Sequence, residues 1–301
     1  MRFHHLDLNL LVALDALLTE QSITRAAERL HLSQSAMSGA LARLREHFHD
    51  ELLAQVGRRM VPTALGDSLR TSVRELLLQI QSTIEPRSSF DPQTSGRRFT
   101  LMVSDDVASI VFGEVVRRAA ERAPAITFAF LAPDEAAAES LDRGDIDFIV
   151  LPREHALADH PSLELPGERC VCVVAQERDD IGATISFEEY LGLGHVVVRP
   201  GRTRLPAVDE WFLSRFGFAR RVEVIAADFN AVPQFIVGTR RIALMRERLA
   251  RHYASLLPLR VLPPPVEIPP LTDVLQWHRV QDKDPANLWL RELVREVASQ
   301  I

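Results

Sequence analysis

The sequence has almost no lysine, only two cysteines and no long hydrophobic run. Lys283 is the only lysine among 35 basic residues. Arginine therefore carries nearly all of the positive charge, and it makes the bidentate contacts to phosphate and guanine that lysine cannot make. The base composition of the genome is the plainer explanation of this bias. Two cysteines, Cys170 and Cys172, are too few for a disulfide framework.

No apolar run approaches the roughly 18–20 residues that span a bilayer. The first residues also lack the basic-then-apolar layout of a signal peptide. We therefore expect a cytoplasmic, reduced protein without membrane partners. The length of 301 residues predicts about two domains, and contents of 47% hydrophobic and 25% charged residues exclude a disordered chain. The net charge of −6 argues against binding a polyanion over the whole surface, but it permits a local surface that reads DNA.

The sequence also lacks the motifs of common catalytic sites. It contains no Gly-x-Ser-x-Gly, no Walker loop and no dinucleotide fingerprint. His47 and His49, at a predicted helix end, are poorly spaced for one metal ion. Cys170 and Cys172 point the same way on a predicted strand, where packing is the main interpretation and a redox switch the alternative. We expect no enzymatic activity, no cofactor and no metal.

Three short helices are predicted in the first fifty residues. Leucines recur at helical spacing over 8–20. Ser22 can cap a short second helix, and Ser33 can cap a third helix over 34–48. The third helix has one apolar stripe and a polar opposite side. The stripe consists of Met37, Leu41, Leu44 and Phe48.

A hairpin and a long helix follow. Residues 51–61 predict a hairpin with Gly57 at the turn and Arg58 and Arg59 at its tip. Pro62 opens the helix. Its apolar residues are spaced by four and three positions, close to a heptad seam, which favours a partner helix. Packing within its own domain is the alternative. The expected dimerisation residues are Leu65, Leu69, Val73, Leu76 and Ile80.

Beyond a linker rich in turn formers, strands and helices alternate. This alternation predicts βαβ units and mostly parallel sheets. The chain crosses between two α/β lobes near 166–172 and 260–272, an arrangement that suits a hinged cleft for a small ligand. Strands are expected at 99–103, 126–131, 146–151, 170–175, 195–199, 222–226, 241–245 and 272–277, and helices at 107–122, 134–142, 186–192, 206–216, 229–237 and 286–299.

Residues 22–48 have the length and spacing of a helix-turn-helix. In such a motif the second helix enters the major groove with its N-terminus first. Gln34 can pair with adenine, while Ser35 and Ser38 can reach bases or phosphates. An ordinary three-helix domain with a polar surface is the alternative. The candidate phosphate contacts are Arg43, Arg58 and Arg59, of which a wing arginine can also enter a narrow minor groove.

This segment resembles the winged helix-turn-helix of LysR-type transcriptional regulators. The opening at 6–11 and the closing stretch Asp284–Arg291 most resemble the branch that holds regulators of nodulation and of aromatic catabolism. Ser35 stands where many members have proline, so we expect altered contacts rather than lost function. The stretches that carry the likeness are Leu6-Asp7-Leu8-Asn9-Leu10-Leu11, Ser22-Ile23-Thr24-Arg25-Ala26-Ala27, Leu32-Ser33-Gln34-Ser35-Ala36-Met37-Ser38 and Arg43-Leu44-Arg45.

The resemblance extends over essentially the whole chain and implies an α/β protein. It implies a winged helix-turn-helix and a long dimerisation helix, followed by a two-lobed effector-binding domain of the type 2 periplasmic-binding-protein kind. The implied parts are 1–62 for DNA binding, 63–86 for the helix, 87–97 for a hinge and 98–301 for the effector domain, with lobe I at about 98–165 and 270–301 and lobe II at about 166–269.

The resemblance further implies a homodimer or homotetramer on a DNA dyad, with a thymine and an adenine about eleven nucleotides apart. A small-molecule co-inducer and RNA polymerase are the other implied partners. Residues 1–90 hold ten arginines and ten acidic residues, so any positive field there must come from their placement. The residues expected at DNA are Ser22, Thr24, Ser33, Gln34, Ser35, Ser38, Gly39, Arg43, Arg58 and Arg59.

The family analogy places the effector between the lobes, and ligands in open α/β sheets lie beyond the carboxyl ends of strands. Arg169 and Arg199 could balance a carboxylate or phenolate, with solvation or ion pairing as the alternative. Asp105 and Asp106 could instead cap the following helix. The expected effector residues are Ser104, Asp105, Val111, Arg169, Arg199, Thr203, Phe229 and Asn230.

Two functions from different classes remain. The first is a DNA-binding regulator that responds to an aromatic or anionic effector. The second is a small-molecule binding protein or enzyme that uses the cleft, with the N-terminal helices serving only for dimerisation. Retardation of upstream DNA by the purified protein favours the first, whereas turnover that survives deletion of residues 1–90 favours the second.

Overall fold

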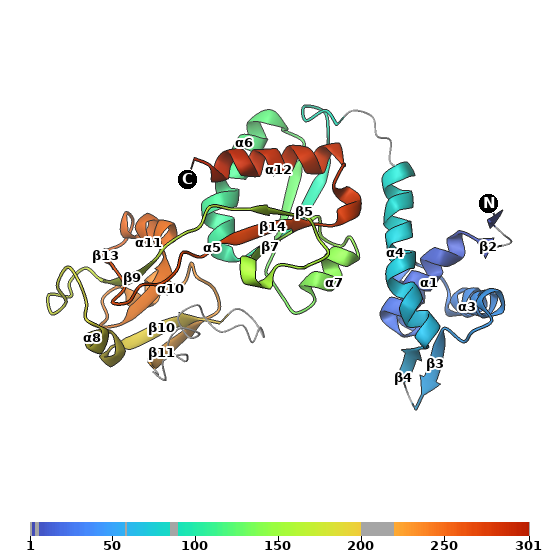
Figure 1. Ribbon diagram of the computed structural model, residues 1–301, viewed down its shortest axis with the longest axis horizontal. Coiled ribbons are helices and arrows are strands. Elements are labelled where there is room, and N and C mark those ends of the chain that lie inside the picture. Colours follow the sequence, from blue (N-terminus) through green and yellow to red (C-terminus); the bar gives the residue numbers. More distant parts are fainter. Residues whose placement is uncertain (1, 4–5, 58, 85–89, 200–219, 301) are drawn as a thin grey trace. The chain divides into compact units, whose positions relative to one another are not determined.

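The protein was analysed as a computed structural model, which forms two compact units, Met1–Ser88 and Ser89–Ile301 (Figure 1). No helix among its described residues has the length and hydrophobicity to cross a membrane. Within the same residues, no three His, Cys, Asp or Glu side chains gather as a metal site. The structure describes residues 2–3, 6–57, 59–84, 90–199 and 220–300.

The first unit is a small helical domain with a two-stranded hairpin. Ser22 and Ser33 cap the second and third helices, accepting hydrogen bonds from the amides of Arg25 at 3.4 Å and Ala36 at 3.1 Å, as predicted. Its elements are β1 (Arg2–Phe3), β2 (Leu6–Asp7), α1 (Asn9–Glu20), α2 (Ile23–Arg29), α3 (Gln34–Phe48), β3 (Leu53–Val56), β4 (Arg59–Pro62) and α4 (Ala64–Ile84).

One apolar core joins the helices of this unit. The predicted stripe of α3 lies in it: Met37, Leu41 and Leu44 are buried, and Phe48 packs against them at the edge. Leucines of α1 fill the remainder. His31, in the turn between α2 and α3, has a φ of +54°, which gives the tight reversal that the sequence predicts.

The seam of α4 is divided between two environments. Val73 is buried in the core of the unit, and Leu65 and Leu69 pack against that core. Leu76 is 42% exposed, and neither it nor Ile80 belongs to the core cluster. The prediction that all five seam residues face a partner helix is therefore corrected for the first three. Their hydrophobic surface is used within the unit because α4 packs along α1.

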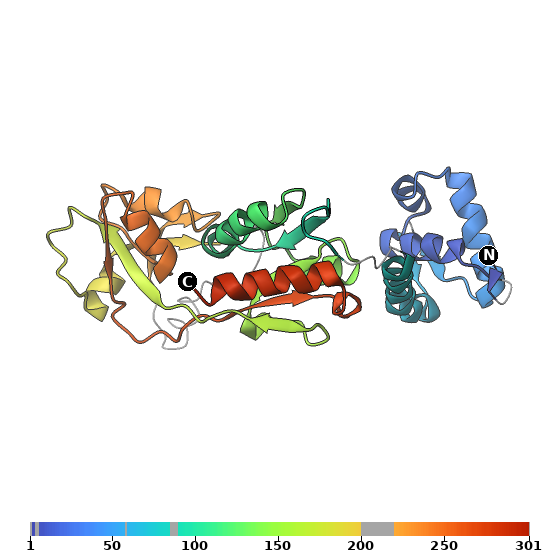
Figure 2. The same ribbon diagram turned by 90° about the horizontal axis from the view of Figure 1, so that it is seen from above.

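The second unit contains two five-stranded sheets, each with helices packed on it (Figures 1 and 2). The sheet of lobe I has the order β6-β5-β7-β14-β8, and that of lobe II has the order β11-β10-β12-β9-β13. Lobe I comprises β5 (Arg98–Met102), α5 (Asp105–Val107), a π-helical turn η1 (Ala108–Phe112), α6 (Gly113–Arg122), β6 (Thr127–Leu131), α7 (Ala137–Asp142), β7 (Phe148–Pro152), η2 (Arg153–His155), β8 (Ser162–Glu164), β14 (Asp273–Trp277), η3 (Arg279–Gln281) and α12 (Pro285–Ala298).

Lobe II lies between the two passages of the chain. Its elements are β9 (Cys170–Ala175), α8 (Phe187–Gly192), β10 (Gly194–Val198), β11 (Arg221–Ala226), α10 (Val232–Ile236), β12 (Ile242–Arg246), α11 (Glu247–Ala254) and β13 (Leu259–Leu262). The predicted helix at 206–216 and the candidate residue Thr203 fall outside the described residues.

The expectation of mostly parallel sheets was wrong. In lobe I, β5 pairs in parallel with β6 and β7, whereas β14 pairs antiparallel with β7 and β8. Lobe II repeats this arrangement, with β9 antiparallel to β12 and β13. The cause is the double crossing, because a strand that enters a lobe from its neighbour runs against the local βαβ units. The sequence analysis also missed β8 and β13, two short strands at sheet edges.

Two antiparallel segments connect the lobes. Glu168 and Leu271 exchange backbone hydrogen bonds of 2.8 Å in both directions, which ties the outgoing passage to the returning one. Cys170 and Cys172 lie just beyond the outgoing passage and are buried in β9. Burial raises the pKa of these thiols to about 11 and about 12, so little thiolate forms near neutral pH. Packing, rather than a redox switch, is the role that this setting favours.

Lobe II should lose stability in mild acid because of a buried histidine. His195 is 0% exposed, and its Nε2 lies 2.7 Å from the carbonyl oxygen of Tyr190. Burial lowers the pKa of His195 from 6.5 to about 4. Between pH 6.5 and pH 4, His195 therefore stays neutral in the folded state but is protonated in the unfolded state. Stability is full above pH 6.5 and falls by about 3 kcal/mol as the pH decreases toward 4.

Urea denaturation of the full chain at several pH values measures this loss. His195→Gln keeps a donor for the Tyr190 carbonyl and removes the titration, so its stability should change less between pH 7 and pH 4.5. Parallel pH profiles of the parent and this variant would exclude His195 as the source of the acid sensitivity.

Candidate functional site

The start of α3 presents a polar, solvent-exposed face. Gln34, Ser35 and Ser38 are exposed, while Met37 and Ala40 turn inward to the core. The hydroxyl oxygens of Ser33 and Ser35 lie 3.0 Å apart, so a serine in the first turn is accommodated without disturbing the N-cap. This geometry leaves the first turn of the helix open to a partner.

The rest of the predicted reading surface lies on the same two helices and on the hairpin. Thr24 is exposed at the start of α2, and Ser22 is half-buried because it caps that helix. Gly39 is exposed, and no atom lies within 4 Å of the position that a β-carbon would occupy there. Arg59 is exposed on β4, whereas Arg58 lies outside the described residues.

Acidic side chains of the first unit neutralise its supporting arginines. Asp15 on α1 pairs with Arg74 at 2.9 Å, and Glu20 pairs with Arg25 at 3.5 Å. Arg43 is exposed and has no ion-pair partner among the described residues. Among the described side chains of this unit, the arginines without an ion-pair partner, Arg43 and Arg59, therefore belong to the predicted reading face. The other pairs are Arg29 with Asp15 and Glu20, Arg45 with Glu51, and Arg70 with Asp67.

Side chains outside the predicted set fix the hairpin beside α3. From α3, Arg45 donates to the backbone carbonyls of Glu51 at 2.9 Å and Leu53 at 2.8 Å. Asp50 accepts hydrogen bonds of 2.6 Å from the Leu52 amide and from the Thr63 hydroxyl, closing the base of the hairpin. Sequence reasoning missed these residues because their contacts depend on how the hairpin folds back. The two-residue turn at Gly57, with a φ of +63°, agrees with the prediction.

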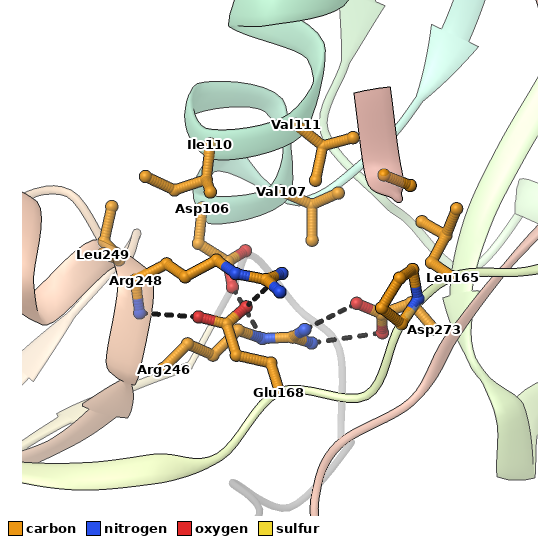
Figure 3. Close-up of a pocket in the computed structure, with 12 residues that line it drawn as sticks. Asp106, Val107, Ile110, Val111, Leu165, Glu168, Arg246, Arg248, Leu249 and Asp273 are labelled. Atoms are coloured by element: carbon orange, nitrogen blue, oxygen red, sulfur yellow. Dashed lines mark hydrogen bonds and ion pairs between the residues drawn. The ribbon is translucent and has the colours of Figure 1, made fainter. Parts of the chain in front are cut away.

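A cluster of charged side chains occupies the connection between the lobes (Figure 3). Arg246 of β12 forms a bidentate pair with Asp273 at 2.6 and 3.1 Å, and its Nε lies 2.9 Å from Asp106. Glu168 accepts a hydrogen bond of 2.7 Å from the Arg248 amide. Burial raises the pKa of Asp106, and the neighbouring Arg246 acts in the opposite direction. These charges come from lobe I, from lobe II and from the outgoing passage.

The cavity inside this cluster is too small for an effector. It is lined by Val107, Val111 and Leu165 beside the charges and has a volume of about 20 Å³. That is room for about one water molecule, whereas ligand pockets measure roughly 300 Å³ or more. Val111, one of the expected effector residues, lies here among structural side chains. Sequence analysis treated Asp106 only as a possible cap and did not single out Glu168, Arg246 or Asp273.

The structure brings three other expected effector residues into mutual contact. The carboxylate of Asp105, in lobe I, accepts hydrogen bonds from the amides of Phe229 at 3.1 Å and Asn230 at 2.8 Å in lobe II. The side-chain amide of Asn230 donates to the same carboxylate at 2.7 Å. The N-cap of α5 is Ser104, which makes no side-chain capping hydrogen bond, and Asp105 and Asp106 lie in the first turn of the helix. The carboxylates of both aspartates also reach across to lobe II.

The two expected arginines lie apart from each other. Arg169 is 75% exposed in its side chain and pairs with Glu247 at 2.9 Å, as the alternative interpretation proposed. Arg199 is exposed directly after β10, at the carboxyl end of that strand. Ser104 likewise follows β5, so Ser104 and Arg199 occupy equivalent positions at strand ends in the two lobes.

A helix-turn-helix with an exposed recognition helix, joined through a long helix to a hinged two-lobed domain, defines a ligand-responsive DNA-binding regulator. The chain belongs to the LysR family of such regulators. Residues 8–67 match the family described as bacterial regulatory helix-turn-helix protein, lysR family. Residues 92–299 match the LysR substrate binding domain.

Relatives and solved structures agree with this assignment. The chain is 45% identical over 299 residues to nodulation protein D 2 of Rhizobium tropici, covering 99% of this chain and 95% of that protein. It is 43% identical to nodulation protein D 1 of Bradyrhizobium elkanii, covering 100% and 96%. A full-length OxyR variant from Pseudomonas aeruginosa has the same fold, with a TM-score of 0.70 at 17% identity over 98% of this chain and 95% of that one.

A solved structure of CbnR with its target DNA also matches in fold, with a TM-score of 0.53 at 14% identity over 97% of this chain and all of that one. The chain is therefore a LysR-type transcriptional regulator that binds DNA, carries a small-molecule effector domain and forms oligomers. It is not an enzyme. The alternative in which the N-terminal helices serve only for dimerisation is set aside.

Proposed function

We propose that this regulator binds a DNA dyad as a homodimer or homotetramer and contacts RNA polymerase in the cytoplasm. The observation that supports this proposal is the polar face of α3, on which Arg43 has no ion-pair partner in the part of the chain that the structure describes, while Arg45 and Arg74 are paired with acidic residues. Half-sites about one helical turn apart fit two such helices related by a two-fold axis. The proposed DNA contacts are Ser22, Thr24, Ser33, Gln34, Ser35, Ser38, Gly39, Arg43, Arg58 and Arg59. In this proposal residues 1–62 bind DNA, residues 63–86 form the dimerisation helix, residues 87–97 are the hinge and residues 98–301 bind the effector.

The effector that we propose is an aromatic or anionic small molecule bound between the lobes. Ser104 and Arg199 stand at carboxyl ends of strands, where ligands of open α/β sheets bind. Phe229, whose amide donates to Asp105, offers an aromatic side chain in lobe II, and Arg199 offers a charge for a carboxylate or phenolate. Several relatives are named nodulation protein D, and we propose that the chain controls an operon of the kind that these nodulation regulators control.

Footprinting on the intergenic DNA upstream of its own gene tests the proposal. Protection of a dyad, with a thymine and an adenine about eleven nucleotides apart, is expected from the purified full-length protein. No protection at low or moderate salt, with or without aromatic carboxylates and phenols, would contradict it.

Arg43→Ala is expected to weaken operator binding without changing which bases are preferred. Each contact to a phosphate releases counterions on binding, so log K falls as log salt rises. Removing one contact should make this negative slope shallower by about 1 for each bound subunit. Gln34→Ala should instead reduce discrimination at one base pair by about 1–3 kcal/mol and leave the slope unchanged. Fluorescence anisotropy over a salt series separates the two effects.

Arg70→Ala is the matched control, because Arg70 lies on α4 and pairs with Asp67 at 3.6 Å. It removes the same charge away from the reading face and should leave the slope at the parental value. An Arg43→Ala protein whose slope equals that of Arg70→Ala would remove Arg43 from the DNA interface.

A further inference from the structure

The two lobes are joined by more than their connecting passages. Asp105, at the start of α5 in lobe I, accepts three hydrogen bonds of 2.7–3.1 Å from Phe229 and Asn230 in lobe II. Two of the donors are backbone amides, which cannot rotate away from the carboxylate. Hydrogen bonds to a charged acceptor are shorter and stronger than neutral ones. This contact is therefore a strongly directional link between the lobes.

Neighbouring side chains set the orientation of Asn230. The Tyr253 hydroxyl donates to Asn230 Oδ1 at 3.0 Å, which turns the amide nitrogen toward Asp105. That nitrogen also lies 3.0 Å from the Ser109 hydroxyl, one turn along from Asp105 in the π-helical segment. Burial and the nearby carboxylates raise the pKa of Tyr253, so it keeps its donor proton. Asn230 is thus held from both lobes in the one orientation that serves Asp105.

The next residue of lobe I makes a second link. Asp106 pairs with Arg246 of lobe II, and Ile110 packs against the apolar core of lobe II. Asp105, Asp106, Ser109 and Ile110 of this stretch therefore contact lobe II, whereas Val107 and Ala108 pack in the core of lobe I. Arg246 of lobe II also forms the bidentate pair with Asp273 at the start of β14, and Glu168 pairs with Leu271 between the two passages. Rotation of one lobe against the other must break the contacts of Asp105 together with these ion pairs.

We propose that Asp105 and Asn230 form a clasp that helps to set the angle between the lobes, and that an effector acts by disengaging it. Ser104 precedes Asp105 in lobe I, and Phe229 precedes Asn230 in lobe II. A ligand that contacts both Ser104 and Phe229 would therefore displace both residues of the clasp. An open groove of about 590 Å³, lined by Ser109, Asn230 and Tyr253, gives solvent access to the clasp. The part played by the effector rests on the function proposed above, whereas the clasp itself does not.

Asn230→Asp tests the clasp with a nearly isosteric change. It places a second carboxylate against Asp105 at a hydrogen-bond distance of 2.7 Å, which turns attraction into repulsion. Spin labels on Ala138→Cys in lobe I and Glu188→Cys in lobe II, both exposed, report the interlobe distance in the full-length protein. Labelled subunits are diluted with unlabelled ones, so that distances within one subunit dominate. A sample without the added cysteines accounts for label on Cys170 and Cys172.

Without effector, the parent should give one narrow distance distribution. Asn230→Asp should shift the ratio of displaced to clasped lobes by at least about tenfold, the change expected when one charged hydrogen bond is lost. Asp105→Asn with Asn230→Asp removes the repulsion but turns an amide nitrogen toward one of the two backbone amides, so it should narrow the distribution only in part. Asp228→Asn is the control: the Asp228 carboxylate accepts a hydrogen bond of 2.7 Å from the Ala231 amide within lobe II, so this variant should leave the distribution unchanged.

A transcription reporter separates the clasp from the proposed function. If Asn230→Asp displaces the lobes and raises output without effector, both proposals are supported. If it displaces the lobes while output and effector response stay parental, the clasp stands and the coupling of lobe angle to transcription is wrong. A distance distribution that superimposes on the parental one overturns the clasp, whatever the reporter shows.

Discussion

Gly66→Ala is expected to destabilise the DNA-binding unit by about 3 kcal/mol and to abolish operator binding at physiological temperature. A β-carbon at Gly66 would lie 2.3 Å from the backbone carbonyl oxygen of Leu52. That carbonyl cannot withdraw, because it accepts a hydrogen bond of 3.0 Å from the Thr63 amide. Leu52 itself is fully buried and has a φ of +58°, so its backbone is already held in an unfavourable region. The methyl group must therefore push α4 away from the base of the wing.

Gly39→Ala is the matched control, and its expected change in stability has the opposite sign. Gly39 lies inside α3 with open space around its missing β-carbon, so alanine should stabilise the unit by about 0.5–1 kcal/mol. Urea denaturation of the full chain measures both variants, with the transition of the effector domain as an internal reference. Equal stability of the parent and Gly66→Ala would show that the backbone at Leu52, at the base of the hairpin, moves to make room for the methyl group. A stable Gly39→Ala protein with weakened operator affinity would show that α3 approaches DNA closely at this residue.

Local rules predicted most of the DNA-binding unit. An N-cap needs only a serine a few residues before the backbone amides that donate to it, so Ser22 and Ser33 could be identified from spacing alone. The two-residue turn at Gly57 is equally local. Arg45 and Asp50 were missed because their partners lie on the folded-back hairpin, where spacing carries no information.

The effector domain shows the limit of such rules. The alternation of strands and helices predicted two α/β lobes, but strand direction depends on which lobe a passage comes from. Asp105 was placed correctly at a strand end, while its partner Asn230 lies 125 residues away in the chain. The charges at Arg246 and Asp273 stand at the ends of apolar strands. A charge at such a position was the only available signal of the ion cluster at the connection.

Leu76→Asp is expected to convert the oligomer to a monomer and to reduce operator affinity at least about a hundredfold. Two linked recognition helices bind a dyad far more tightly than one, because the second contact is intramolecular. Leu76 is the seam residue best suited to the test, since it is 42% exposed and absent from the core cluster. A carboxylate there leaves the fold of its own unit intact, whereas the same change at Val73 would bury an unpaired charge.

Sedimentation equilibrium of the full-length protein measures the change of mass, and anisotropy with operator DNA measures the loss of affinity. Thr71→Asp adds the same charge to the same helix at an exposed position, roughly 140° around the axis from Leu76. It should leave both mass and affinity at parental values. Monomers from both variants would indicate that charge anywhere on α4 disrupts the oligomer. A Leu76→Asp protein that keeps its parental mass would assign the oligomer interface to other residues. Leu76 would then be exposed to solvent in the oligomer as well. The stability of α4 would in that case depend on the half of its seam that packs along α1.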